Sequence, residues 1–290
     1  MKRITLYMLP VLLLMGCSKY DLEGFVTSSS ARVDVRFEQS MLYNQSQGET
    51  HLTTSEEYAV YVCSDSHLTT DSQYVAAFAR AYKSDTTCRI AIHLGDLITG
   101  QNHYETFFAA MATEPIGYRV GKDTVFYTIG NHDLFFNQWE FYKQYVPTTF
   151  YWFDTHTEAG KKLDLFVCID TGEGTVGRKG IQWLRDVLES KSQEGYRHII
   201  VFTHTHFFGS SGNQALTSGL ALEEVHELTG MFQTNGVTEV WSGHVHKRSH
   251  EQMGNVQYYT WSALQPQGDG KSVYEVVTMG TEIAHQCVIR

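Results

Sequence analysis

A repeated alternation of short apolar runs with amphipathic segments constrains the fold of this chain more than any other feature. The apolar runs are rich in β-branched and aromatic residues, which is typical of strands, and the segments between them carry apolar residues at helical spacing. Strand-like runs lie within 57–67, 88–98, 123–133, 162–172, 197–206 and 238–246, and helical patterns within 72–84, 103–114, 177–193 and 219–235. This alternation predicts an α/β core with parallel strands.

The last part of the chain has a different pattern. Three β-like runs, 256–264, 272–279 and 281–289, follow one another without intervening helices, and Gly280 joins the last two. We expect these runs to form a second, more antiparallel sheet.

Size and charge limit the classes of function. The chain has 290 residues, of which 42% are hydrophobic, so it is long enough for one large globular domain or two small ones. Its formal net charge of −10 argues against non-specific nucleic-acid binding, which requires a basic surface. The charge does not exclude a small anionic substrate, because bound metal ions can override the local field.

The amino-terminal residues predict a targeting segment. Lys2 and Arg3 precede an apolar run, 4–15, that is too short to span a bilayer as a helix, and Cys17 ends the sequence Leu-Met-Gly-Cys. This resembles a bacterial lipobox; the alternative is an ordinary secretory signal that contains a cysteine. The resemblance implies a lipoprotein signal peptide over 1–17 and an extracytoplasmic protein anchored to a bacterial membrane by lipid on Cys17. The Ser that follows Cys17 favours the outer membrane.

The segment that follows the signal peptide, 18–57, is polar, and we interpret it as a tether in which 31–37 forms a possible edge strand. The main domain is then 58–290. Cys63 and Cys168 lie in strand-like runs and are expected to be small buried residues. A disulfide between Cys88 and Cys287 is possible in an oxidising compartment, and the sequence leaves it open.

Polar residues stand where several of the predicted strands end. These residues are Asp65, His67, Asp96, Asn131, His132, Asp133, His204, His206, His244 and His246. In open α/β sheets functional sites gather beyond the carboxyl ends of the strands. Carboxylate, imidazole and amide groups without thiolates suit zinc, manganese, iron or cobalt. There are more such groups than one metal needs, and they fit a pair of metals bridged by a carboxylate and a hydroxide.

The order of the motifs resembles the calcineurin-like metallophosphoesterase family. The motifs D-x-H, G-D, G-N-H-D, H and G-H-x-H occur in this order from about Tyr58 to about His246, with Gly95, Gly130 and Gly243 in place. The resemblance implies an α/β fold, a four-layer αββα sandwich of two mixed β-sheets flanked by helices. Each motif alone is weak, but the five in order at strand ends are specific.

The resemblance also implies a role for each strand-end residue. The first of two divalent metal ions would be held by Asp65, His67 and His246. The second would be held by Asn131, His204 and His244. Asp96 would bridge the two ions, and a hydroxide between them would attack the phosphorus. The metal could be Mn, Fe, Zn or Co.

Two histidines are expected to act without binding metal. His132 would serve as the general acid for the leaving oxygen, and Asp133 would orient its ring and favour its protonated form. His204 is preferred over His206 as the metal ligand, although His206 occupies the place of the proline in the usual H-x-P pattern. His206 would contact substrate or lie as a polar residue at the rim.

Departures from the family patterns exclude two subgroups. The protein serine/threonine phosphatases bind phosphate through arginines in these motifs, and the sequence around Asp96 has no such arginine. Asp133 occupies the position at which those enzymes carry Glu. Thr99 occupies the place of the tyrosine that binds iron in purple acid phosphatases. A protein phosphatase and a tyrosinate-bound iron are therefore not expected.

The resulting hypothesis is a lipid-anchored, two-metal-dependent phosphoesterase that hydrolyses a small phosphomonoester or phosphodiester. The alternative is a metal-containing surface lipoprotein that binds a ligand without turning it over. The complete set of ligand residues favours the enzyme. The sequence does not specify the substrate, the choice between monoester and diester, or the oligomeric state.

Overall fold

The computed structural model describes residues 32–100, 103–111, 124–208 and 219–290. The predicted signal peptide, Cys17 and the first part of the predicted tether lie outside the described residues. No helix in the described ranges is long and apolar enough to cross a membrane.

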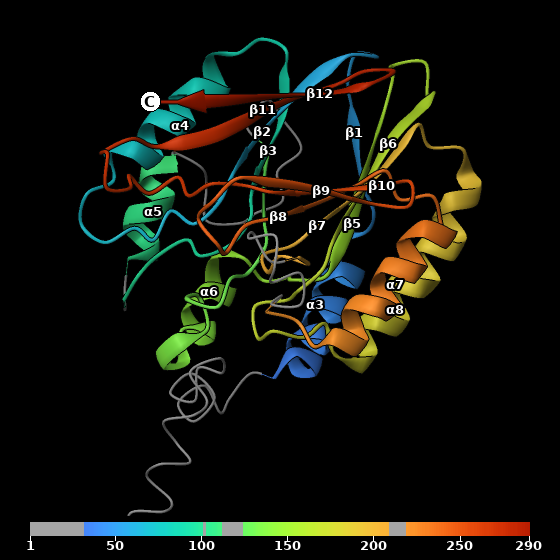
Figure 1. Ribbon diagram of the computed structural model, residues 1–290, viewed down its shortest axis with the longest axis horizontal. Coiled ribbons are helices and arrows are strands. Elements are labelled where there is room, and N and C mark those ends of the chain that lie inside the picture. The colour runs from blue at the N-terminus through green and yellow to red at the C-terminus, as the bar shows by residue number, and fades with distance from the viewer. Residues whose placement is uncertain (1–31, 101–102, 112–123, 209–218) are drawn as a thin grey trace, which may run out of the picture.

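Two mixed sheets form the centre of the molecule (Figure 1). The five-stranded sheet has the order β12 (Ile283–Ile289), β11 (Val273–Met279), β2 (Tyr58–Cys63), β3 (Cys88–His93), β4 (Val125–Tyr127). The seven-stranded sheet has the order β1 (Thr50–Thr53), β5 (Tyr151–His156), β6 (Lys162–Cys168), β7 (His198–Phe202), β8 (Glu239–Ser242), β10 (Val256–Thr260), β9 (Ser249–Met253).

Helices cover the outer face of each sheet. Helices α4 (Gln73–Ser84), α5 (Tyr104–Met111) and α6 (Trp139–Tyr145) pack on the five-stranded sheet. Helices α3 (Val33–Gln47), α7 (Gly177–Lys191) and α8 (Leu222–Thr234) pack on the seven-stranded sheet. A third apolar cluster, which includes Val60, Ile92 and Phe166, fills the space between the sheets. The predicted αββα sandwich is therefore confirmed, and short 3₁₀ turns occur at Phe135–Asn137 and Ser192–Glu194.

Parallel pairing brings together the strand ends that carry the candidate site residues. Strands β2, β3 and β4 are parallel neighbours, as are β6, β7 and β8, so the carboxyl ends within each group lie at one edge of their sheet. The strand-like runs and the helices predicted between 57 and 246 occur as expected, except that residues 112–123 lie outside the described part.

The expected strand at 31–37 is wrong, because residues 33–37 form the start of helix α3; residue 31 lies outside the described part. The alternating Val33 and Val35 suggested a strand, but the residues buried from this segment are Val33, Arg36 and Ser40, spaced for one face of a helix. The Arg36 guanidinium forms an ion pair with Asp170, 2.7 Å from Nε to Oδ2, and both side chains are fully buried. Within the predicted tether, 18–57, the strand at the edge of a sheet is instead β1, which pairs in parallel with β5.

The terminal strands do not form a separate sheet as we expected. Strand β10 joins the seven-stranded sheet in parallel with β8, whereas β11 and β12 form the predicted hairpin and extend the five-stranded sheet beside β2. The predicted burial of Cys63 and Cys168 is confirmed, and Cys88 and Cys287 are both free thiols.

Candidate metal centre

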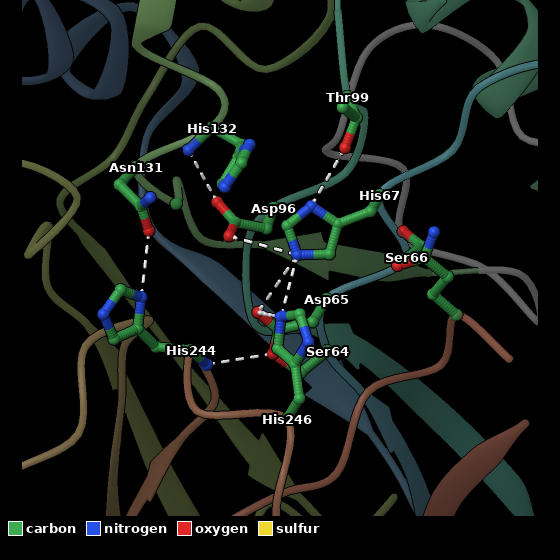
Figure 2. Close-up of polar contacts among 12 residues, drawn as sticks. Ser64, Asp65, Ser66, His67, Asp96, Thr99, Asn131, His132, His244 and His246 are labelled. Carbon is green, nitrogen blue, oxygen red and sulfur yellow. Dashed lines mark hydrogen bonds and ion pairs between the residues drawn. The ribbon is translucent and has the colours of Figure 1, made fainter. Parts of the chain in front are cut away.

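The strand-end residues converge at the edge where the carboxyl ends of β2, β3, β4, β7 and β8 meet (Figure 2). The loops after β2, β3 and β4 belong to one sheet, and those after β7 and β8 to the other, so the site spans both sheets. This is the position that the strand order of an α/β protein favours for a ligand site.

One group of donors consists of Asp65, His67 and His246. His67 Nε2 lies 2.9 Å from His246 Nε2, and the latter lies 3.3 Å from Asp65 Oδ1. The distance from His67 Nε2 to Asp65 Oδ1 is 3.8 Å. These three atoms therefore face a common point.

A second group consists of Asp96, His204 and His244. His204 Nε2 lies 3.1 Å from His244 Nδ1. Asn131 Oδ1 lies 3.0 Å from His204 Nε2 and 2.9 Å from His244 Nδ1. Asn131 thus adds an amide oxygen to the group. Of the two histidines in the T-H-T-H segment, His204 is the one whose ring enters this group.

Asp96 lies between the two groups. Its Oδ2 is 3.5 Å from His67 Nε2 in the first group and 3.4 Å from His204 Nε2 in the second. Its Oδ1 accepts a hydrogen bond of 2.8 Å from the backbone N–H of His132. One carboxylate is therefore shared by the two clusters of nitrogen donors.

The electrostatics of this cluster favour a bound cation. Asp65 Oδ1 is buried and accepts no hydrogen bond of acceptable geometry from the described residues, even though His246 Nε2 is close. Burial lowers the pKa of His204, but the neighbouring Asp96 and Asp65 carboxylates outweigh it and raise that pKa to about 10. A site that stabilises a proton so strongly also stabilises a metal ion, and its oxygen and nitrogen donors fit a borderline divalent metal.

The tautomer of His204 is set by its second ring nitrogen. His204 Nδ1 lies 2.7 Å from the carbonyl oxygen of Leu94, which can only accept, so Nδ1 keeps its proton and Nε2 is the nitrogen that would lose its proton and offer a lone pair to a bound metal ion. His67 Nδ1 lies 3.1 Å from the hydroxyl of Thr99, while its Nε2 faces Asp96 and His246. Contacts of this kind orient metal-binding histidines.

The backbone at the donors adopts a conformation that is uncommon outside glycine. Positive φ angles occur at Asp65 (52°), His67 (41°), Asp96 (55°), His244 (76°) and His246 (56°). This left-handed conformation costs about 1–2 kcal/mol per residue. In the described part of the chain, Asn137 is the one further non-glycine residue with positive φ, so this strain is concentrated at the site, as is common at functional sites.

The motif glycines are required because the loops approach one another closely. A Cβ at Gly130 would lie 2.1 Å from Asp96 Oδ1, one at Gly243 would lie 1.8 Å from Ser64 Oγ, and one at Gly95 would lie 2.7 Å from the nitrogen of Gly130. Any side chain at these positions would displace the loops that carry the donors.

The structure contradicts the role we expected for Asp133. Its Oδ2 accepts hydrogen bonds from the backbone N–H groups of Asp96 (2.9 Å) and Gly130 (3.0 Å), and its Oδ1 accepts one from Leu97 (3.1 Å). Tyr104 donates its hydroxyl to Oδ1 as well, at 3.3 Å. The Asp133 carboxylate therefore holds the backbone of two donor loops together and does not orient the His132 ring.

His132 itself is half-buried at the edge of the first group. Its ring packs edge-on against His67, with 4.5 Å between the ring centroids, and lies tilted against Phe135, with 4.8 Å between the centroids. Together with His67 and Asp96 it forms a third cluster of donor atoms. The ring is thus near both groups without belonging to either.

His206 lies beside the second group and not at an exposed rim. It is 5% exposed. Its ring stacks on that of His244 with 5.6 Å between centroids. This low exposure argues against the expected position at the rim, and contact with substrate stays a prediction.

Several supporting residues were not predicted from the sequence. Ser66 Oγ lies 2.7 Å from Nε2 of the buried His93, and Ser64 donates its hydroxyl to Asp65. Burial lowers the pKa of His93 to about 3, so this imidazole is neutral. The position of Ser64 and Ser66 next to Asp65 is the only sequence signal of these contacts. Nothing local marks Asp170, whose partner Arg36 is 134 residues away.

An αββα sandwich that gathers carboxylate, imidazole and amide donors at the carboxyl ends of its strands defines a class of metal-dependent hydrolases. Over residues 58–248 the sequence matches the family described as calcineurin-like phosphoesterase, and the chain belongs to this family. No protein of curated function matches the sequence.

Solved structures with a similar fold include GAP50, described as the anchor in the inner membrane complex of Plasmodium. It has a TM-score of 0.57 and 13% identity, with 80% of this chain and 84% of that chain covered. Purple acid phosphatase PPD1 from yellow lupin (Lupinus luteus) has a TM-score of 0.58 and 12% identity, with 81% and 52% covered. PhoD has a TM-score of 0.57 and 10% identity, with 82% and 69% covered. At these identities the likeness concerns the fold alone.

Proposed function

We propose that this protein is a two-metal-dependent phosphoesterase that hydrolyses a small phosphomonoester or phosphodiester. The observation that carries the proposal is the position of Asp96, whose Oδ2 lies 3.5 Å from His67 Nε2 and 3.4 Å from His204 Nε2. A carboxylate shared by two clusters of ring nitrogens is the arrangement that a pair of bridged metal ions requires.

Each cluster would hold one ion. Asp65, His67 and His246 would bind the first, Asn131, His204 and His244 would bind the second, and Asp96 would bind both. Divalent manganese, iron, zinc or cobalt would polarise the phosphoryl oxygens and lower the pKa of a water molecule so that hydroxide is available at neutral pH. The buried Asp65 Oδ1, which accepts no hydrogen bond from the described residues, supports this assignment.

His132 would donate a proton to the leaving oxygen. Its ring is half-buried and adjoins both His67 and Phe135, so it is held near the centre while one side stays accessible. Its own backbone N–H binds Asp96 Oδ1, which fixes the loop that carries the ring. A positioned general acid of this kind contributes about 10²–10⁴-fold to the rate.

The test is hydrolysis of p-nitrophenyl phosphate and bis-p-nitrophenyl phosphate by the full chain loaded separately with manganese, iron or zinc. We expect metal-dependent turnover that Asp96→Asn abolishes and that Asp186→Asn, on the exposed face of α7, leaves unchanged. The better substrate would show whether monoesters or diesters are preferred. Protein that holds two metal ions and turns over neither substrate nor a wider panel of phosphoesters would instead support the non-catalytic alternative.

The role of His132 has a sharper test. A general acid matters most when the leaving group is a poor one, so His132→Ala should lower kcat much more for phenyl phosphate than for p-nitrophenyl phosphate. His226→Ala removes an exposed histidine on α8 and serves as the control. Equal losses on the two substrates would contradict the acid role.

His206 is proposed to contact substrate at the second metal position. Its stacking on His244 supports this, because the stack holds its ring next to that cluster. If so, His206→Ala should raise KM for p-nitrophenyl phosphate while the metal content stays at the wild-type value.

We also propose that the chain is an extracytoplasmic lipoprotein anchored through Cys17 to a bacterial membrane, most simply the outer membrane. The support is the charged start, the short apolar run and the Leu-Met-Gly-Cys sequence. Cys17→Ala should prevent incorporation of labelled palmitate and release the protein from the membrane fraction. Continued labelling of this variant would refute the assignment.

A further inference from the structure

A cavity of about 330 Å³ lies away from the metal centre, between the carboxyl end of α3, the edge strand β1, its neighbour β5, and helix α7. In Figure 1, α3 and α7 lie beside each other and pack on the seven-stranded sheet, to which β1 and β5 belong. None of the proposed metal ligands lines the cavity. Its volume is at the lower end of the range for small-molecule sites.

Two tryptophans form the aromatic part of the cavity. Trp152 on β5 and Trp183 on α7 are both half-buried and both line it. Phe37 and Phe150 pack edge-on against Trp183, with centroid distances of 6.5 and 5.9 Å, and these contacts hold its ring. Lys191, which does not line the cavity, places its Nζ 4.0 Å from the Trp152 ring centroid.

Polar groups of the cavity lack partners in the described part of the protein. No hydrogen bond involves the indole N–H of Trp152 or of Trp183 there, nor the side-chain amide of Gln45. Asn44 donates Nδ2 to the carbonyl oxygen of Phe150 at 2.6 Å, which leaves its own Oδ1 as an acceptor. Gln47 adds a third amide to the lining. The cavity therefore offers donors and acceptors together with aromatic surface.

The charge of the lining selects among ligand classes. Glu49 is the one charged side chain among the described residues that line the cavity, and the nearby Lys191 lies over the Trp152 ring and pairs with Glu194, so the lining itself offers no cationic group to a phosphate or a carboxylate. A purely apolar ligand would cover the amides and indole N–H groups without pairing them, which is unfavourable for each polar group that is buried. A suitable ligand is uncharged, with hydroxyl groups at its edge and C–H groups on its faces.

We infer that this cavity binds a neutral sugar unit. The C–H face of a pyranose ring would pack on an indole ring, and its hydroxyls would pair with the amides of Asn44, Gln45 and Gln47 and with the indole N–H groups. The inference concerns residues that the proposed phosphoesterase centre does not use.

The test measures binding of cellohexaose, laminarihexaose, mannohexaose and N-acetylchitohexaose to the full chain by titration calorimetry and by tryptophan fluorescence. We expect at least one of these neutral oligosaccharides to bind with Kd below about 1 mM, which corresponds to about −4 kcal/mol. The anionic hexagalacturonate should not bind. Asp96→Asn should bind the same oligosaccharide as tightly as wild type, which separates this result from that of the phosphoesterase test.

Variants in the cavity should weaken the binding selectively. Trp183→Ala should raise Kd about tenfold or more and Trp183→Phe less, because Phe keeps an aromatic face but loses the N–H. Gln45→Ala should raise Kd a few-fold without affecting folding, since this side chain is exposed and has no protein partner. Gln193→Ala, an exposed amide outside the cavity, is the control. Absence of binding by all four oligosaccharides, or binding unchanged in Trp183→Phe and Gln45→Ala, would overturn the inference.

Discussion

Thr99 shows how a single hydroxyl can fix a metal ligand. Its Oγ1 lies 3.1 Å from His67 Nδ1, the ring nitrogen that faces away from the donor cluster. With a proton on Nδ1, the hydroxyl accepts it, and Nε2 is left as a lone pair that faces Asp96 and His246. Thr99, at the position that carries a tyrosine in purple acid phosphatases, thus orients the candidate ligand His67 through its hydroxyl.

Removal of this hydroxyl should weaken metal binding. We expect Thr99→Val to lower the affinity for the first metal by about 10–100-fold, as is typical for loss of a residue that orients a ligand. Thr99→Ser keeps the hydroxyl and should bind metal nearly as wild type does. The measurement is metal titration of the chelator-treated protein. Equal affinities of Thr99→Val and wild type would show that His67 is held by its packing alone.

Asp133 supports the centre through the backbone. Burial and the nearby Asp96 raise the pKa of Asp133, whereas the N–H groups of Gly130 and Leu97 lower it and favour the charged carboxylate that accepts their hydrogen bonds. Asp133→Asn should destabilise the protein, because an amide replaces one acceptor oxygen with N–H groups that face N–H donors. The expected loss is about 1–3 kcal/mol for each buried group left unpaired. Urea unfolding measures it, and an Asp133→Asn protein as stable as wild type would exclude this role.

At the scale of elements, helix α3 depends on a contact that local sequence does not reveal. The guanidinium of Arg36 binds Asp170 through two nitrogens, Nε to Oδ2 at 2.7 Å and Nη2 to Oδ1 at 2.9 Å, in a fully buried setting. Asp170 follows β6, and the next residue, Thr171, accepts the backbone N–H of Thr205 in the loop that carries His204. The helix is therefore connected to the metal centre through one short segment.

Breaking this ion pair should be costly. Arg36→Ala leaves the Asp170 carboxylate buried without its partner, and we expect a loss of about 3–5 kcal/mol in the free energy of unfolding. Arg185→Ala, which breaks an exposed pair with Glu227, should cost less than about 1 kcal/mol. Urea unfolding of both variants compares them. If Arg36→Ala were no more destabilising than Arg185→Ala, α3 would be held by its apolar contacts alone.

The elements that the sequence predicts correctly are those whose residue pattern lies within the element itself. The buried strands β2, β3 and β7 are continuous apolar runs, and their polar ends marked the donors because parallel strands bring these ends together. Helix α3 was misread because its inward residue Arg36 is polar, and its burial depends on the distant carboxylates of Asp170 and Glu173. The role of Asp133 was misread for a related reason, since its partners are backbone groups of another loop.

At the scale of the whole molecule, the sequence does not specify which sheet each terminal strand joins. Strands β10 and β11 are both apolar and adjacent in the chain, yet they belong to different sheets. The segment between them connects the sheets, and it donates the N–H of Leu264 to the carbonyl oxygen of Ser64 at the edge of the metal centre. Such long-range pairing depends on packing that periodicity alone does not encode.

Because the donors come from loops of both sheets, bound metal should stabilise the molecule as one unit. Asp65, Asp96 and Asn131 follow strands of the five-stranded sheet, whereas His204 and His244 follow strands of the other. Metal that binds only the folded state adds about 4 kcal/mol when its free concentration is a thousandfold above Kd. Calorimetry should therefore show that a chelator lowers Tm in one cooperative transition and that manganese or zinc restores it.

The stoichiometry then decides between one ion and two. We expect two metal ions per chain in wild type, and a reduced metal content with a smaller rise of Tm in Asp96→Asn, because this variant alters the carboxylate shared by both clusters. His226→Ala should behave as wild type. A single ion that is retained in Asp96→Asn would mean that the two clusters do not act as a bridged pair. A Tm unaffected by chelator in protein shown to lose its metal would mean that protein contacts, such as the hydrogen bond from the His244 N–H to Asp65 Oδ2, hold the loops of the two sheets together without help from the ions.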